Sequence, residues 1–140
     1  MKIISAFVFA FILAVLSLSA AETLYPKTLE QYEKVRAALV VDDLSAAKKA
    51  ALTLAASAKM ESASEIQDAI QKLADSSSLK EARAAFQTLS LGVEKWVKGQ
   101  KGYFIVTCPM IQNSVWIQTT DKIGNPYAGK AMQECGEIRK

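Results

Sequence analysis

The sequence predicts an α+β protein, in which an antiparallel bundle of about four helices is followed by a C-terminal β-hairpin and a short helical turn. The first observation is that apolar side chains recur three and four residues apart through residues 28–98, as they do on the buried faces of helices. The second is a change of texture after residues 99–102, where β-branched and aromatic residues typical of strands take over. Because a lone hairpin is only marginally stable in water, we expect it to pack on the bundle.

Most of the predicted helices begin at a polar residue that can cap free backbone N–H groups. The S/T-x-x-E/Q pattern of a capping box starts at Thr28, at Ser62 and at Ser78. Asp42 or Asp43 can cap the helix that follows the first one. The four helices are expected over residues 29–41, 44–60, 63–74 and 79–98.

The C-terminal region is expected to contain shorter elements. These are strands over residues 103–107 and 115–120, a turn at 112–114, a loop at 124–127 and a helical turn over 128–134. Trp96 and Trp116 are natural packing anchors between the hairpin and the bundle. Gly136 is expected to close the last turn in a left-handed conformation.

The first 21 residues have the pattern of an export signal. Lys2 supplies a positive charge, residues 3–18 are almost entirely apolar, and residues 19–21 are small, as a cleavage site requires. The sequence therefore predicts a signal peptide over residues 1–21 and one mature domain over residues 22–140, in the periplasm or secreted. The alternative is a retained membrane anchor, but residues 3–18 are marginal for a span, which takes about 20 apolar residues. We therefore expect cleavage and no membrane span after it.

Composition excludes several functional classes. The chain has no histidine to act as a base, and no serine or cysteine stands in a recognisable nucleophile motif, so an enzyme is not expected. The formal net charge is only +3, and a nucleic-acid partner would require a clustered basic face with stacking aromatics. These features favour a binding protein without a nucleic-acid partner.

Both cysteines and two of the four methionines form two short pairs, Cys108 with Met110 and Met132 with Cys135. Residues two apart in an extended chain share a face, as do residues three apart on a helical turn, so each pair can converge. Thiolates with thioethers favour Cu(I), with Ag(I) as a chemical mimic, over harder ions. The four residues are therefore candidate ligands of a soft metal ion.

A Cys108–Cys135 disulfide is the competing interpretation. Exported domains commonly join their cysteines in this way. The bond would stabilise the fold by roughly 3 kcal/mol, because it restricts the unfolded chain. Met110 and Met132 would then serve as flexible filler in the core. On the residues alone, the disulfide is the favoured interpretation.

A resemblance shifts this balance towards metal. The pattern of Cys108-Pro109-Met110, then Trp116, then N-P-Y-x-G-x-x-M-x-x-C-G over residues 125–136 closely resembles a bacterial periplasmic family of unknown function. The members of that family occur alone or as the C-terminal domain of adaptor (membrane-fusion) subunits of copper/silver-type efflux pumps. The helical region is similar to the family as well. The resemblance implies metal handling, an efflux adaptor as a partner and the four sulfur residues as copper ligands.

The chain departs from the family pattern in one loop. The segment between Met110 and Trp116 is short, and Ile111 replaces a small residue, so this side chain would either cover the site or fill it. Asn125-Pro126-Tyr127 offers no soft donor and is expected to shape its loop. The expected function is thus an exported soft-metal binding protein that assists metal handling or efflux. The alternative is a disulfide-closed module that docks on an efflux adaptor without binding metal.

Overall fold

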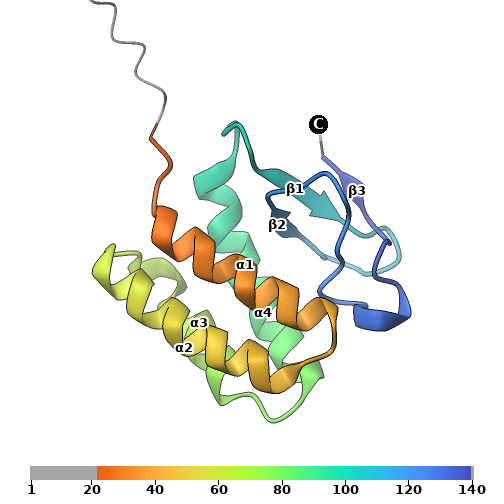
Figure 1. Cartoon of the computed structure of the whole chain (residues 1–140), viewed down its shortest axis with the longest axis horizontal. Coiled ribbons are helices and arrows are strands. Elements are labelled where there is room, and N and C mark those ends of the chain that lie inside the picture. The colour runs from red at the N-terminus through yellow and green to blue at the C-terminus, as the bar shows by residue number, and fades with distance from the viewer. Residues whose placement is uncertain (1–21, 140) are drawn as a thin grey trace, which may run out of the picture.

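The computed structural model describes residues 22–139, so the predicted signal peptide lies outside the described residues. Within this range the chain forms helices α1 (Pro26–Val40), α2 (Leu44–Met60), α3 (Gln67–Asp75) and α4 (Leu79–Val97), short 3-10 helices η1 (Ser64–Ile66) and η2 (Gly129–Ala131), and strands β1 (Phe104–Thr107), β2 (Trp116–Gln118) and β3 (Glu137–Ile138). The predicted α+β class and helical bundle are confirmed. In Figure 1 the sheet lies beside α1 and α4, at one side of the bundle.

None of the helices in residues 22–139 has the length and apolar character that crossing a membrane requires. Two of them begin where the sequence predicts. The side chain of Asp43 accepts the N–H of Ala46 at 2.8 Å and so caps α2. The hydroxyl of Ser78 accepts the N–H of Glu81 at 3.2 Å and so caps α4. Each of these bonds satisfies a backbone donor that the first turn of a helix leaves free.

The other two predicted capping boxes are wrong. Helix α1 begins at Pro26, ahead of Thr28, because the first helical position makes no use of an N–H group. Thr28 is buried, and both its N–H and its hydroxyl donate to Glu61 at the end of α2, at 2.8 and 2.7 Å. After Ser62 the chain makes the 3-10 turn η1, and α3 starts only at Gln67.

The predicted hairpin is confirmed, and it is extended by a third strand. Strand β1 pairs antiparallel with β2, where Val106 lies opposite Trp116, and with β3, where Val106 lies opposite Ile138. The order of the sheet is therefore β2-β1-β3. Strand β3 was not predicted, because two exposed residues carry no alternation of apolar and polar side chains.

Aromatic side chains join the sheet to the bundle. Trp116 is fully buried, and its ring lies edge-on to Tyr127 with centroids 6.0 Å apart. Tyr32 of α1 stacks on Phe86 of α4 at 5.0 Å, and its hydroxyl accepts the N–H of Ile117 in β2 at 3.2 Å. Burial raises the pKa of Tyr32 well above its usual value, so the hydroxyl stays neutral. Trp116 is thus a packing anchor of the hairpin, and it reaches the bundle through Tyr127, whose ring centroid lies 5.9 Å from that of Phe86 in α4.

Trp96, the other predicted anchor, stabilises the bundle itself. Its ring packs edge-on against Tyr25 with centroids 4.6 Å apart. Its indole N–H donates to Glu65 in η1 at 2.8 Å. Trp96 therefore connects the end of α4 to the start of α1 and to η1.

Candidate sulfur site

Cys108 and Cys135 form a disulfide that joins the end of β1 to the C-terminal segment. Their Cα atoms lie 5.8 Å apart, a common separation for this bond. Cys108 is only 3% exposed, whereas Cys135 is half-buried. The site is therefore a covalent junction between two segments that are 27 residues apart in the sequence.

Each cysteine belongs to a tight turn that contains one of the candidate methionines. The N–H of Ile111 donates to the carbonyl of Cys108 at 3.1 Å, so Met110 lies inside the first turn. The extended conformation expected for this pair is therefore wrong. In the second turn the N–H of Cys135 donates to the carbonyl of Met132 at 3.2 Å. The two ends of such a turn lie within about 7 Å at their Cα atoms, so Met132 and Cys135 are neighbours.

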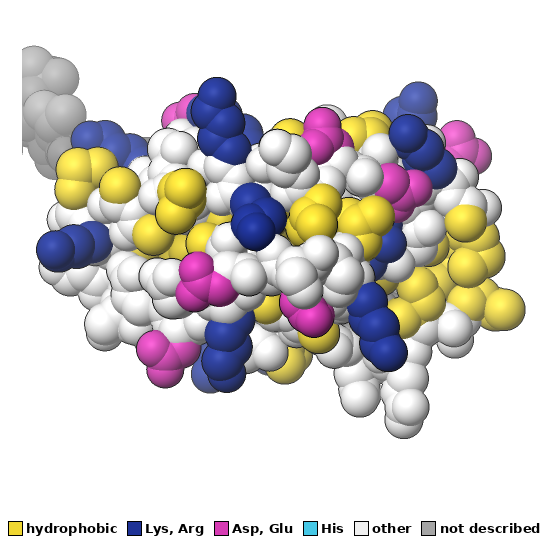
Figure 2. Space-filling model, turned by 90° about the horizontal axis from the view of Figure 1, so that it is seen from below, with side chains coloured by type: hydrophobic (Ala, Val, Ile, Leu, Met, Phe, Trp, Pro, Cys, Tyr) yellow, Lys and Arg dark blue, Asp and Glu magenta, His cyan; other side chains and the backbone are white. Residues whose placement is uncertain are grey.

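Both methionine side chains reach the surface. Met110 is 73% exposed and Met132 is 44% exposed. Their predicted use as core filler, in the presence of a disulfide, is therefore wrong. Pro109 and Ala131 beside them are exposed as well. Figure 2 shows hydrophobic side chains gathered at the end of the molecule that carries η2 and the β1–β2 loop.

Asn125 organises the segment that carries Cys135. Its side chain is fully buried, and the amide nitrogen donates to the carbonyl of Cys135 at 2.8 Å. The amide oxygen accepts the N–H groups of Tyr127 at 2.8 Å and of Ala128 at 3.0 Å. The backbone N–H of Asn125 donates to the carbonyl of Gln133 at 2.7 Å. The structure thus confirms that the Asn-Pro-Tyr segment shapes its loop.

Ser114 has the corresponding place beside Cys108. Its hydroxyl accepts the N–H of Cys108 at 2.9 Å and donates to the carbonyl of the same residue at 3.0 Å. The serine is 3% exposed. Sequence reasoning missed Ser114, because it treated the residue only as part of a turn. Its position directly before the buried Val-Trp-Ile stretch was the available signal.

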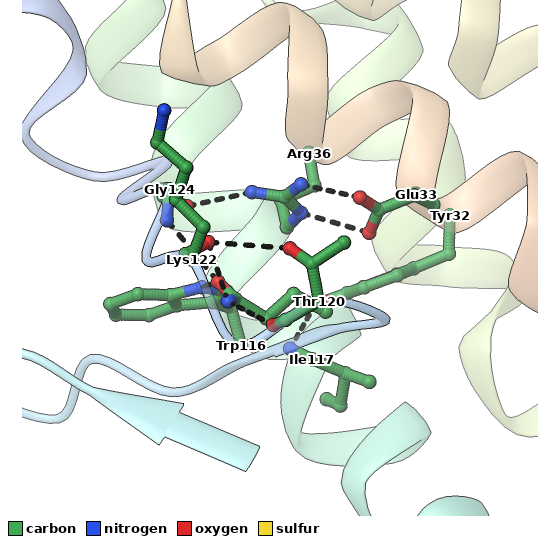
Figure 3. Close-up of polar contacts among 9 residues, drawn as sticks. Tyr32, Glu33, Arg36, Trp116, Ile117, Thr120, Lys122 and Gly124 are labelled. Carbon is green, nitrogen blue, oxygen red and sulfur yellow. Dashed lines mark hydrogen bonds and ion pairs between the residues drawn. The ribbon is translucent and has the colours of Figure 1, made fainter. Parts of the chain in front are cut away.

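Two arginines of the helical bundle hold the loop that leads to Cys135. Arg36 of α1 donates to the carbonyl of Gly124 at 2.8 Å and pairs with Glu33, as Figure 3 shows. Arg83 of α4 donates to the carbonyl of Pro126 at 2.8 Å. A carbonyl 40 or more residues away in the sequence gives no pattern around the arginine, so these contacts were not predicted.

Asp42 fixes the beginning of η2. It pairs with Arg83 and accepts the N–H of Lys130 at 3.1 Å. The hydrogen bond from Arg83 lowers the pKa of Asp42, so this carboxylate remains charged to a more acidic pH than usual. Gly129 has a φ of 54°, and a Cβ atom there would collide with Asp42 and Arg83. Glycine is therefore required at this position.

Gln118 closes the loop between β2 and the Asn-Pro-Tyr segment. Its side chain is fully buried and its oxygen accepts the indole N–H of Trp116 at 2.9 Å and the N–H of Gly124 at 3.2 Å. Its nitrogen donates to the carbonyls of Thr120 at 2.6 Å and Lys122 at 2.9 Å. Figure 3 shows Thr120, Lys122 and Gly124 on one side of the indole of Trp116. Through Gln118, the loop that leads to Cys135 is thus connected to Trp116, the same residue that anchors the sheet.

The left-handed conformation predicted for Gly136 is wrong. In residues 22–139 the glycines with a positive φ are Gly99, Gly102 and Gly129. A Cβ atom at this position would lie 2.8 Å from the Cη2 atom of Trp116 and 3.0 Å from side-chain atoms of Ile123 and Val106. Glycine is therefore required here for close approach. It lets the chain next to Cys135 lie against the buried tryptophan.

The donor set fits a soft ion only after reduction of the disulfide. In residues 22–139 there is no group of three or more His, Cys, Asp or Glu side chains that could hold a metal ion. In the disulfide, the sulfur atoms of Cys108 and Cys135 are bonded to each other. Two electrons and two protons would free two thiols at the same place. The predicted ligation of a metal by the four sulfur residues stays a prediction.

Comparison with known proteins finds a family match for the helical part of the chain. The family model described as "Protein of unknown function (DUF3347)" matches residues 28–102, slightly more than half of the 140 residues. The match spans α1 to α4 and ends before β1, so both cysteines lie beyond it. No curated protein and no solved structure matches the chain. The chain therefore belongs to the DUF3347 family.

Proposed function

We propose that this protein is exported and binds Cu(I), or a similar soft ion, through the reduced thiols of Cys108 and Cys135, and that it assists metal handling or efflux. The observation that carries this proposal is the meeting of the two cysteines, whose Cα atoms are 5.8 Å apart, at an end of the molecule where two thioethers are exposed. Soft sulfur ligands select Cu(I) over the harder divalent ions.

The methionines support the proposal by their exposure. Met110 lies in the turn that starts at Cys108, and Met132 starts the turn that ends at Cys135. Met110 is 73% exposed and Met132 is 44% exposed, so neither side chain lies in the core and burial gives little reason for methionine at these two positions. Ligand exchange with a partner such as an efflux adaptor requires donors that the partner can reach, and exposed thioethers meet that requirement.

Substituting both methionines with leucine tests their role. In the variant Met110→Leu/Met132→Leu, we expect the reduced protein to bind Cu(I) on the order of tenfold more weakly, which corresponds to about 1.4 kcal/mol of binding energy. The change preserves size and apolar character, so the thermal stability should stay the same. The measurement is an anaerobic competition titration with a Cu(I) chelator of known affinity.

Met60 provides a matched control, because it is 69% exposed at the end of α2 and has no cysteine beside it in the sequence. Met60→Leu should leave the Cu(I) affinity unchanged. Equal affinities of the wild type, the control and the double variant would contradict a role for Met110 and Met132 as ligands.

The second candidate function is a disulfide-closed interaction module that docks on an efflux adaptor and binds no metal. It is favoured by the disulfide itself and by a pocket of about 650 Å³ beside Cys108, between α4 and the loop that follows β1. The residues lining this pocket include Thr88, Leu91, Ile111 and Arg139. Under this alternative, the protein keeps its disulfide in the cell, and the reduced form takes up no copper.

A further inference from the structure

We infer that Ser114 and Asn125 are positioning residues that hold Cys108 and Cys135 opposite each other without help from the disulfide. The reduced protein then presents a preformed pair of thiols. This inference deepens the proposed function, on which it rests only for the identity of the ligand. It assigns a role to two buried polar side chains that bind no metal themselves.

The contact at Cys108 is reciprocal. One hydroxyl, that of Ser114, accepts the N–H of Cys108 at 2.9 Å and donates to its carbonyl at 3.0 Å. A single side chain therefore contacts both backbone polar groups of the cysteine, whose carbonyl also accepts the N–H of Ile111. Because Ser114 is 3% exposed and directly precedes the buried end of the hairpin, its hydroxyl has little freedom to move. The backbone of Cys108 is fixed by this contact before any sulfur bond forms.

The contact at Cys135 is equally independent of sulfur. The amide nitrogen of Asn125 donates to the carbonyl of Cys135 at 2.8 Å, and its oxygen accepts two further N–H groups, those of Tyr127 and Ala128. A fully buried amide that makes all these bonds is costly to displace, because any group left unpaired in the interior loses its hydration.

The segment around Asn125 is itself tied to the residue before β2 and to the end of α1. The hydroxyl of Tyr127 donates to the carbonyl of Val115, and the side chain of Gln133 donates to the carbonyl of Val40 at 3.2 Å. The N–H of Lys130 donates to Asp42 at 3.1 Å. None of these bonds involves a sulfur atom. Opening the disulfide therefore leaves in place every polar contact that positions the two cysteines.

A preformed thiol pair has a measurable property, which is a high effective concentration of one thiol at the other. It is measured by the exchange in which the protein disulfide and two glutathione thiols give the protein dithiol and one glutathione disulfide, with transfer of two electrons. Loosening either cysteine favours the dithiol side. The same loosening weakens metal binding, because the ion must then order its ligands.

The test is to equilibrate the full protein with glutathione redox buffers in the absence of metal and to count free thiols by mass. In Ser114→Ala and in Asn125→Ala, we expect the equilibrium to shift towards the dithiol on the order of fivefold to tenfold, which corresponds to about 1 to 1.4 kcal/mol. Ser76→Ala is the matched control, because Ser76 is also 3% exposed and donates its hydroxyl to the carbonyl of Leu73 at 2.7 Å, in the α3–α4 connection. Its equilibrium should equal that of the wild type.

A second measurement covers the case in which a variant fails to fold. In Cys108→Ala/Cys135→Ala, the backbone N–H groups of residues 108, 127 and 128 should keep the hydrogen-exchange protection that they have in the oxidised wild type. Loss of this protection would overturn the inference. The inference would also be overturned if the thiol equilibrium were unchanged in both Ser114→Ala and Asn125→Ala, or if Ser76→Ala shifted it equally. If the equilibria shift as expected but reduced wild type takes up no Cu(I), the positioning role stands and the proposed metal function fails.

Discussion

Substituting Trp116 with alanine is expected to lower the free energy of unfolding by about 3 to 5 kcal/mol, the usual cost of removing a large aromatic side chain from a core. The indole is fully buried and lies edge-on to Tyr127. It also donates to the buried oxygen of Gln118 and packs against Gly136. The substitution therefore removes the contact between the hairpin, the Asn-Pro-Tyr loop and the segment after Cys135.

Urea denaturation followed by far-ultraviolet circular dichroism measures this loss. Trp116→Phe is the appropriate comparison, because it retains an aromatic ring and removes the indole N–H. We expect it to be less destabilising than alanine. A loss below about 1 kcal/mol in Trp116→Ala, the size expected for a surface position, would contradict the central role that the structure gives this side chain.

Removing the disulfide is expected to have the next largest effect on stability. The bond closes a sequence separation of 27 residues, and the chain-entropy account of such a loop gives about 3 kcal/mol of stabilisation. We therefore expect Cys108→Ala/Cys135→Ala to unfold at lower urea concentration than the oxidised wild type. The native fold should persist, because Ser114 and Asn125 hold the two segments through bonds that involve no sulfur.

The wild type in excess dithiothreitol is the control for this variant, and its unfolding curve should coincide with that of the double variant. The near-ultraviolet circular dichroism of the buried Trp116 should also be preserved in both. An unfolding midpoint unchanged by reduction would contradict a stabilising disulfide. Loss of the near-ultraviolet signal would show that the sheet depends on the sulfur bond.

Local sequence patterns predicted the bundle and the hairpin because their causes are local. The caps at Asp43 and Ser78 are local because each joins two residues that are only three apart in the sequence. Apolar spacing alone marks the buried helix faces. The capping box at Thr28 failed because a tertiary partner, Glu61, takes both of its polar groups. Strand β3 exists only because β1 offers it a pairing edge, which nothing in two residues announces.

The sequence allowed us to predict that the two cysteines pair, but not which residues hold them in place. The spacing of sulfur residues pointed to Cys108 and Cys135 as partners, in one of two chemical states. The exposure of Met110 was not predictable, because the chain turns after Cys108 where an extended segment was expected. Ser114 and Arg83 act on carbonyl groups, and any residue offers a carbonyl, so sequence reasoning had no side-chain pattern to detect.

The family relationship and the sulfur site occupy different parts of the chain. The family match covers α1 to α4, whereas Cys108 and Cys135 follow it. The two parts are joined by contacts from α1 and α4, through Arg36 and Arg83, to the loop before Cys135. Through these contacts the helical part of the chain supports the sulfur segment, and the function proposed here depends on that segment.

The most direct test of soft-metal binding is an anaerobic Cu(I) titration of the reduced and of the oxidised protein, followed by native mass spectrometry. We predict that the reduced protein retains one copper ion per chain and that the oxidised protein retains none. Cys108→Ala/Cys135→Ala should behave as the oxidised form. Retention of no copper by the fully reduced and folded protein, or equal retention by the cysteine-free variant, would contradict the proposed function.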